Sequence, residues 1–228
     1  KNVCERIRRI DIITEKKDTY DNILVKIVDG LLINKNKPLQ KIDKNISLGR
    51  SFNNKHYKDF QISNKKRSLI ILHTMGSHGP KYYKRYPSEF DQFQPNCKSN
   101  SPQECSQEEL SNAFDNTILY TDYIIDSLIK ILQKQNKESF LIYASDHGES
   151  LGENGIYLHG VPVAFAPKEQ VHIPWLIWYS DKYKKNNKIT FKNPSEKITH
   201  EFFSHTIMQS LKIDSKTLKK NKSLIQLN

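Results

Sequence analysis

The stretch that decides the fold is FLIYASDHGESLGENGIYLHG, residues 140–160. Its first five residues, Phe140 to Ala144, are the apolar run typical of a strand buried on both faces, and a cluster of carboxylate, imidazole and glycine follows at once. The same succession occurs earlier, where the apolar run 68–73 precedes TMGSHGP at 74–80. Because ligands of open α/β sheets bind beyond the carboxyl ends of the strands, both clusters are candidates for a functional site.

Helical patterns separate these apolar runs. Apolar residues at helical spacing predict helices over 18–33, 110–132 and 199–211, and a further apolar run predicts a third strand over 173–178. Ser106 and Glu109 form a capping box at the start of the long central helix. Strands that alternate with helices predict one α/β domain with a mostly parallel sheet covered on both faces.

Composition excludes several classes of protein. The 228 residues are 36% apolar, which is too apolar for a disordered chain, and 8 glycines and 9 prolines exclude a collagen-like one. No apolar run approaches the roughly 20 residues that cross a bilayer, and the polar N-terminus is not a signal peptide, so any membrane anchor is expected outside this chain.

The charge points to a surface and not to a nucleic-acid groove. Lys and Arg number 36 against 25 acidic residues, a formal charge of +11. The lysines are scattered and no nucleic-acid-binding module accompanies them, so we expect no nucleic-acid partner. A solvated lysine-rich surface is the favoured interpretation, and a weak preference for an acidic surface stays open.

The three cysteines leave two alternatives. Cys97 and Cys105 are eight residues apart in a turn-rich stretch, and Cys4 has no local partner. In a reducing compartment all three would be free thiols. In an oxidising one Cys97 and Cys105 would pair, and Cys4 would need a partner outside this chain.

Asp146 and His147 are the leading candidates for metal ligands. Adjacent at the end of a predicted strand, they offer one carboxylate oxygen and one imidazole nitrogen, a mixture that suits zinc. His78 and His159 lie in the neighbouring clusters. The alternative, a capped turn without a metal, is about as well supported by the residue types alone.

At these residues the chain resembles the phosphoethanolamine transferases of the alkaline phosphatase and sulfatase superfamily. Three stretches carry the resemblance: LHTMGSHGPKYYKRYP (72–87), NAFDNTILYTDYIID (112–126) and SDHGESLGENGIYLHGVPVAFAPKEQVHIP (145–174). The resemblance implies a three-layer α/β/α sandwich with a mostly parallel sheet, in a catalytic domain on the periplasmic side of the inner membrane of a Gram-negative bacterium.

The resemblance also implies the chemistry. A zinc-activated threonine takes phosphoethanolamine from phosphatidylethanolamine, and the covalent intermediate passes it to a surface acceptor such as lipid A, a modification linked to polymyxin resistance. Asp146 and His147 correspond to zinc ligands, and His78 and His159 lie beside the phosphoryl group or bind a second zinc. A disulfide between Cys97 and Cys105, contact with the membrane surface and a monomeric state are expected.

Roles of the neighbouring side chains stay open at this point. Glu149 could be a partner of zinc or of a histidine, or the N-cap of a helix. Tyr82 could line a lipid or sugar site or simply pack in the loop. His73 is expected to be a buried core residue, and Lys168 and His172 are expected at the surface.

Two features of the resembling family have no match here. Neither the acidic zinc ligand nor the nucleophilic threonine corresponds to a motif in this chain, so we expect residues 1–228 to be the later part of one catalytic domain, with the nucleophile and transmembrane segments upstream. Two other functions compete: a sulfatase or phosphodiesterase-type metal hydrolase, and a membrane-surface binding module without catalysis.

Overall fold

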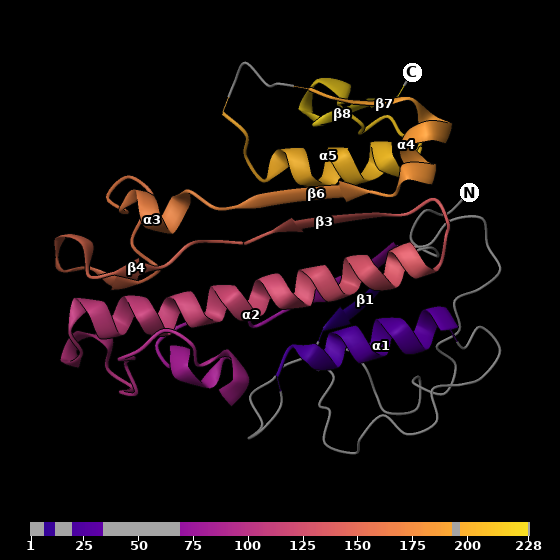
Figure 1. The fold of residues 1–228 in the computed structure, drawn as a ribbon. Helices are drawn as coiled ribbons and strands as arrows, with labels where there is room; N and C mark the ends of the chain where they lie inside the picture. Colours follow the sequence, from indigo (N-terminus) through magenta and orange to yellow (C-terminus); the bar gives the residue numbers. More distant parts are fainter. Residues whose placement is uncertain (1–6, 12–19, 34–68, 193–196, 228) are drawn as a thin grey trace, which may run out of the picture. The chain divides into compact units, whose positions relative to one another are not determined.

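The computed structural model describes residues 7–11, 20–33, 69–192 and 197–227 (Figure 1). Cys4 and the start of the helix predicted from residue 18 lie outside the described residues. The chain divides into two compact units. The first contains residues 1–128 and 149–162, and the second contains residues 129–148 and 163–228.

A parallel strand pair opens the first unit. β1 (Ile7–Asp11) pairs with β2 (Leu69–His73) in register from Ile7 with Leu69 to Asp11 with His73. Parallel neighbours need a crossover connection, and α1 (Asn22–Ile33) lies within it. The strand predicted from residue 68 is thereby confirmed. β1 was not predicted, because its sequence IRRID lacks an apolar run.

The central helix α2 (Gln107–Lys134) begins at the predicted capping box. The backbone N–H of Ser106 donates to Glu109 Oε2 at 2.8 Å, and the backbone N–H of Glu109 donates to Ser106 Oγ at 3.2 Å. The buried apolar stripe of the helix consists of Leu110, Ala113, Tyr120, Ile124, Leu128 and Ile131. Ile118, which the helical pattern assigned to this stripe, is 47% exposed instead.

The long segment before α2 is ordered by a few specific contacts. It contains the single-turn helices η3 (Tyr82–Lys84), η4 (Ser88–Phe90) and η5 (Pro102–Glu104). Cys97 and Cys105 form the disulfide that the resemblance implied. The Cys97 N–H also donates to the Glu109 carbonyl at 2.9 Å, which ties the segment to the start of α2.

A small hairpin completes the first unit. β4 (Ser150–Leu151) and β5 (Tyr157–Leu158) pair antiparallel around the turn η6 (Glu153–Gly155). Gly152 has φ +118°, a conformation that side-chain-bearing residues rarely adopt. The hairpin lies between the predicted strands 140–144 and 173–178, where the sequence analysis predicted no strand.

The second unit is built on an antiparallel pair. β3 (Phe140–Ala144) pairs with β6 (Trp175–Tyr179), in register from Phe140 with Tyr179 to Ala144 with Trp175. The prediction of a mostly parallel sheet is therefore wrong for this pair, although both strands were predicted. The hairpin of β4 and β5 and the one-turn helix α3 (Lys168–Val171) lie in the connection between the two strands, which is long enough for either strand direction, so the alternation of elements did not fix the direction.

Helices and a second hairpin complete this unit. α4 (Asp181–Asn187) follows β6 directly, and β7 (Ile189–Phe191) pairs antiparallel with β8 (Ile225–Leu227). Figure 1 shows α5 (Glu201–Ser210) running along β6, where Phe203 meets Trp175 edge-to-face at 5.5 Å between ring centroids. One buried cluster of this unit contains Tyr179, Tyr183 and Ile225, and Phe202 and Leu224 are buried as well. Among the helices in the described residues, none has the length and apolarity needed to cross a bilayer.

Candidate functional site

Glu149 is the centre of a hydrogen-bonded group in the first unit. Its carboxylate side chain is only 4% exposed. The Tyr82 hydroxyl donates to Oε2 at 3.0 Å, and the Gly79 N–H donates to Oε1 at 3.3 Å. His159 Nδ1 lies 2.9 Å from the same Oε1. One buried carboxylate thus joins the loop that follows β2 to the loop that follows β5.

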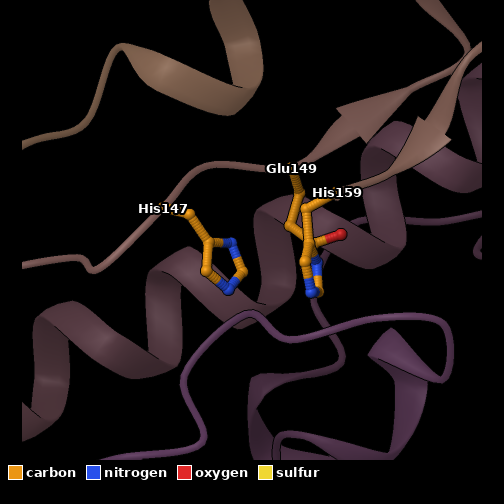
Figure 2. A group of neighbouring side chains, drawn as sticks. All are labelled: His147, Glu149 and His159. Carbon is orange, nitrogen blue, oxygen red and sulfur yellow. The ribbon is translucent and has the colours of Figure 1, made fainter. Parts of the chain in front are cut away.

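This contact orients His159, whose side chain is one-third exposed. Figure 2 shows the side chains of Glu149 and His159 next to one another. A carboxylate oxygen accepts hydrogen bonds, so the proton of a neutral His159 ring resides on Nδ1, and Nε2 carries the ring's lone pair. Leu158, directly before it, has φ +63°, a left-handed conformation that costs about 1–2 kcal/mol for a non-glycine residue. Such backbone strain is typical of functional sites.

His78 approaches His159 from the other strand-end loop. The two rings meet edge-to-face with 5.1 Å between their centroids. His78 Nδ1 lies 2.6 Å from the Gly79 carbonyl, so it too carries the proton on Nδ1 when the ring is neutral. The structure therefore brings together the two histidines that the sequence analysis named as catalytic candidates.

The loop that bears His78 is held at two further points. Asp21 accepts hydrogen bonds from the N–H groups of Met75 at 3.2 Å and Gly76 at 2.9 Å. Burial raises the pKa of Asp21 above its usual value, and these two backbone donors oppose that rise. The Thr117 hydroxyl of α2 donates to Ser77 Oγ at 2.6 Å.

Gly79 permits the close approach of the two loops. A Cβ atom at this position would lie 2.5 Å from Leu158 Cδ2 and 2.9 Å from the Tyr82 hydroxyl. Both distances are shorter than packed side chains tolerate. A larger residue at position 79 would therefore force the side chains of Leu158 and Tyr82 to shift, and Tyr82 is a donor to Glu149.

Tyr82 is a donor of this group and neither a lipid-lining nor a merely packed aromatic residue. It is 1% exposed. Burial, and after it the neighbouring Glu149 carboxylate, raises the pKa of the Tyr82 hydroxyl, so the hydroxyl keeps its proton and can donate to Glu149. The sequence analysis left the role of Tyr82 open, because the two residues are 67 positions apart.

His147 extends the group along the chain, since it precedes Glu149 by two residues. Its Nδ1 lies 3.0 Å from the Gly148 carbonyl, which leaves Nε2 as the lone-pair nitrogen of a neutral ring. Within the segment 147–159, His147, Glu149 and His159 each offer one ligand atom, and these atoms lie within 4.8 Å of one another (Figure 2). Two imidazoles and a carboxylate are a donor set that fits zinc.

Asp146, the other predicted metal ligand, lies outside this three-residue group. Its side chain is 79% exposed, and its Oδ1 accepts the backbone N–H of His147 at 3.1 Å. The sequence analysis left the role of Glu149 open between a partner of zinc or of a histidine and an N-cap, and the structure shows it as a partner of His159. The signal available was its spacing, two residues after His147 and ten before His159.

The remaining predicted positions divide into two groups. Lys168 and His172 are exposed, as expected. His73 was expected to be buried and is exposed instead, because alternate residues of β2 face opposite sides and its side chain falls on the more open one.

Comparison with known proteins shows the family to which this chain belongs. The family model described as Sulfatase matches residues 53–213. The chain is 54% identical over 124 residues to "Phosphoethanolamine transferase EptA" of Salmonella typhimurium, covering 53% of this chain and 22% of that protein. It is 41% identical over 168 residues to "Phosphatidylethanolamine transferase Mcr-2" of Escherichia coli, covering 72% of this chain and 30% of that protein.

Solved structures extend the likeness. The soluble domain of lipooligosaccharide phosphoethanolamine transferase A from Neisseria meningitidis is 34% identical with a TM-score of 0.74, over 92% of this chain and 57% of that one. The periplasmic domain of EcEptC from Escherichia coli, in a complex with Zn, shares the fold at 23% identity and a TM-score of 0.61, over 93% and 52% of the two chains. The chain spans less than a third of the length of the two curated relatives described above.

Proposed function

We propose a function from the family of this chain, which belongs to the sulfatase family, in its group of phosphoethanolamine transferases. Its protein transfers phosphoethanolamine from phosphatidylethanolamine to a lipid A-type acceptor. The observation that carries the proposal is the Glu149 group. It holds His159 in one orientation and brings it against His78, within stretches that are similar to the transferases.

The names of two relatives support the two substrates. Mcr-2 is named a phosphatidylethanolamine transferase, and the Neisseria protein is named for lipooligosaccharide. The proposal includes an inner-membrane location with the catalytic domain in the periplasm of a Gram-negative bacterium. A disulfide between Cys97 and Cys105 suits that oxidising compartment.

Zinc is the proposed metal. His147, Glu149 and His159 have the donor chemistry for it, and Asp146, whose Oδ1 lies 3.8 Å from His147 Nε2, would supply a further carboxylate. When bound, zinc lowers the pKa of a nucleophile and polarises the phosphoryl group. Among the residues of this chain, His147 and His159 would hold the metal through their Nε2 lone pairs, Glu149 would keep the His159 ring oriented, and His78 would lie beside the phosphoryl group.

The nucleophile and the wider architecture belong to the same proposal. We propose that a threonine in a segment of the protein outside these 228 residues takes the phosphoethanolamine group from the donor, which leaves as diacylglycerol, and then passes the group to the acceptor. We also propose that the complete domain has the three-layer α/β/α sandwich with a mostly parallel sheet. The parallel β1–β2 pair and the likeness to the Neisseria structure support this architecture.

Paired substitutions test the assignment. Asp146→Ala and His147→Ala should each lower bound zinc, measured by elemental mass spectrometry, and abolish transfer, measured by mass spectrometry of lipid A from cells that express the variant. Asp214→Ala removes an exposed carboxylate and is the matched control. Full zinc content together with parental transfer in the Asp146→Ala and His147→Ala proteins would refute the assignment. Release of free phosphoethanolamine or sulfate without transfer would favour the hydrolase.

A further inference from the structure

Val163 and Phe165 stand out at the surface of the second unit. They are 79% and 78% exposed, whereas the next most exposed large apolar side chain of the described residues, Phe191, is 56% exposed. Single apolar residues at a surface are ordinary. Two that are almost fully exposed and only two positions apart are typical of a contact surface.

The segment that carries them is anchored at its base. It leads through Pro167 into α3, where Gln170 is 5% exposed. The Gly148 N–H donates to the Gln170 carbonyl at 2.9 Å, and a Cβ at Gly148 would lie 1.9 Å from the Glu169 carbonyl oxygen. Only glycine permits so close an approach. The exposed side chains therefore project from a fixed base.

Charge identifies the partner that fits this surface. The second unit contains 15 lysines against seven acidic residues, which accounts for +8 of the chain's +11. Lys168, three residues after Phe165, is 84% exposed, and its Nζ lies 3.8 Å from Glu169 Oε1, a pair that leaves most of the ammonium group open to solvent. A second copy of the same basic unit would be repelled, whereas an anionic lipid surface attracts the lysines and also offers an apolar interior to Val163 and Phe165.

We propose that residues 163–168 are a membrane-docking element. Val163 and Phe165 enter the boundary between headgroups and acyl chains of an anionic bilayer, and Lys168 lies among the lipid phosphates. The inference rests on the proposed function, because a lipid donor and a lipid acceptor both reach the enzyme from a bilayer. The element begins four residues after His159 in the sequence.

Depth-dependent quenching tests the element directly. The full-length protein, with Phe165→Trp, is reconstituted into vesicles of phosphatidylethanolamine and phosphatidylglycerol that contain lipids brominated on their acyl chains. The emission added to that of Trp175 and Trp178 should fall about twofold, since bromine quenches only an indole within the bilayer. Phe191→Trp, at another exposed aromatic position of the same unit, is the matched control and should be quenched little. No quenching at position 165, or equal quenching at both positions, would overturn the proposal.

A second measurement separates docking from catalysis. Val163→Ser combined with Phe165→Ser should leave thermal unfolding unchanged, because both side chains are exposed. The double variant should lower transfer from bilayer-embedded phosphatidylethanolamine several-fold but leave transfer from a short-chain, water-soluble donor intact. If the double variant transfers from both donors at the parental rates, or loses activity equally with both, docking is refuted. If the parent transfers from neither donor, the proposed function fails, while the quenching result still decides the docking element.

Discussion

The two units of the chain use their buried polar groups in different ways. In the first unit, buried polar side chains connect segments that are distant in sequence: Glu149 accepts from Gly79, 70 residues away, and Asn116 accepts the N–H groups of Gln92 and Phe93 at 2.9 Å each. In the second unit the core is aromatic, and the hydroxyls of its two tyrosines, Tyr179 and Tyr183, both bond to Ser210.

The proposed site residues His78, Glu149 and His159 belong to the first unit, whereas Asp146 and His147 belong to the second. The first unit has a net charge of +3, and its buried hydrogen bonds hold two histidine-bearing loops together. The second unit carries the excess positive charge and the most exposed apolar side chains of the described chain. Damage to a buried polar group should therefore be felt in the first unit as loss of both stability and activity, and in the second as loss of stability.

The largest effect is expected from Glu149→Ala. The change leaves the Tyr82 hydroxyl and the Gly79 N–H buried without their acceptor, which should destabilise the first unit by roughly 3 kcal/mol. Transfer should fall about 10- to 100-fold as His159 loses its orientation. Hydrogen exchange should localise the loss to residues 76–82 and 157–160. Glu108→Ala, at an exposed position of α2, is the control; loss of protection mainly in 140–144 and 175–179 would contradict the comparison.

Removal of the disulfide should have the next largest effect. Replacing Cys97 and Cys105 by alanine should cost about 2–3 kcal/mol, the entropy of the closed loop that they form. Denaturant unfolding of this variant measures the loss, and thiol labelling of the unreduced parent should fail at both positions. All three cysteines precede residue 129, so a reductant should leave the hydrogen-exchange protection of the second unit unchanged.

Tyr179→Phe probes the aromatic core of the second unit. At neutral pH the lost hydrogen bond to Ser210 Oγ should cost about 1 kcal/mol. Burial raises the pKa of Tyr179 from 10.0 to about 12. As the pH rises, the unfolded chain therefore loses the hydroxyl proton at a lower pH than the folded protein does. The contribution of Tyr179 is therefore complete below pH 10 and is lost as the pH rises through 12. Thermal unfolding across this range should show a smaller alkaline decline for the variant than for the parent, and Tyr123→Phe, which is 47% exposed, should behave as the parent does.

The smallest effect is expected at the helix cap. Ser106→Ala removes the acceptor of the Glu109 N–H and should lower stability by about 1 kcal/mol. Ser111→Ala, one turn into α2, is the matched control and should change thermal unfolding little. Equal losses for the two variants would show that the cap contributes nothing specific.

Sequence reasoning succeeded where the determining contacts are local. The capping box of Ser106 and Glu109 spans four residues, and β3 was predicted with its exact ends from one apolar run. It failed where the partner strand is remote. β1 offers no apolar run and gains its place by pairing with β2, and the antiparallel direction of β6 against β3 depends on how 30 intervening residues fold back.

At the site, the sequence by itself determined the inventory: His78, Asp146, His147, Glu149 and His159 follow the ends of two predicted strands. Only the tertiary structure decided that Glu149, and not Asp146, is the buried carboxylate that joins the two loops, and that Tyr82 is its donor. The physical reason is the range of the forces involved. Helix caps and strand periodicity act over a few neighbouring residues. The Glu149 carboxylate, in contrast, is buried, and must therefore be hydrogen-bonded, only once loops about 70 residues apart are packed together.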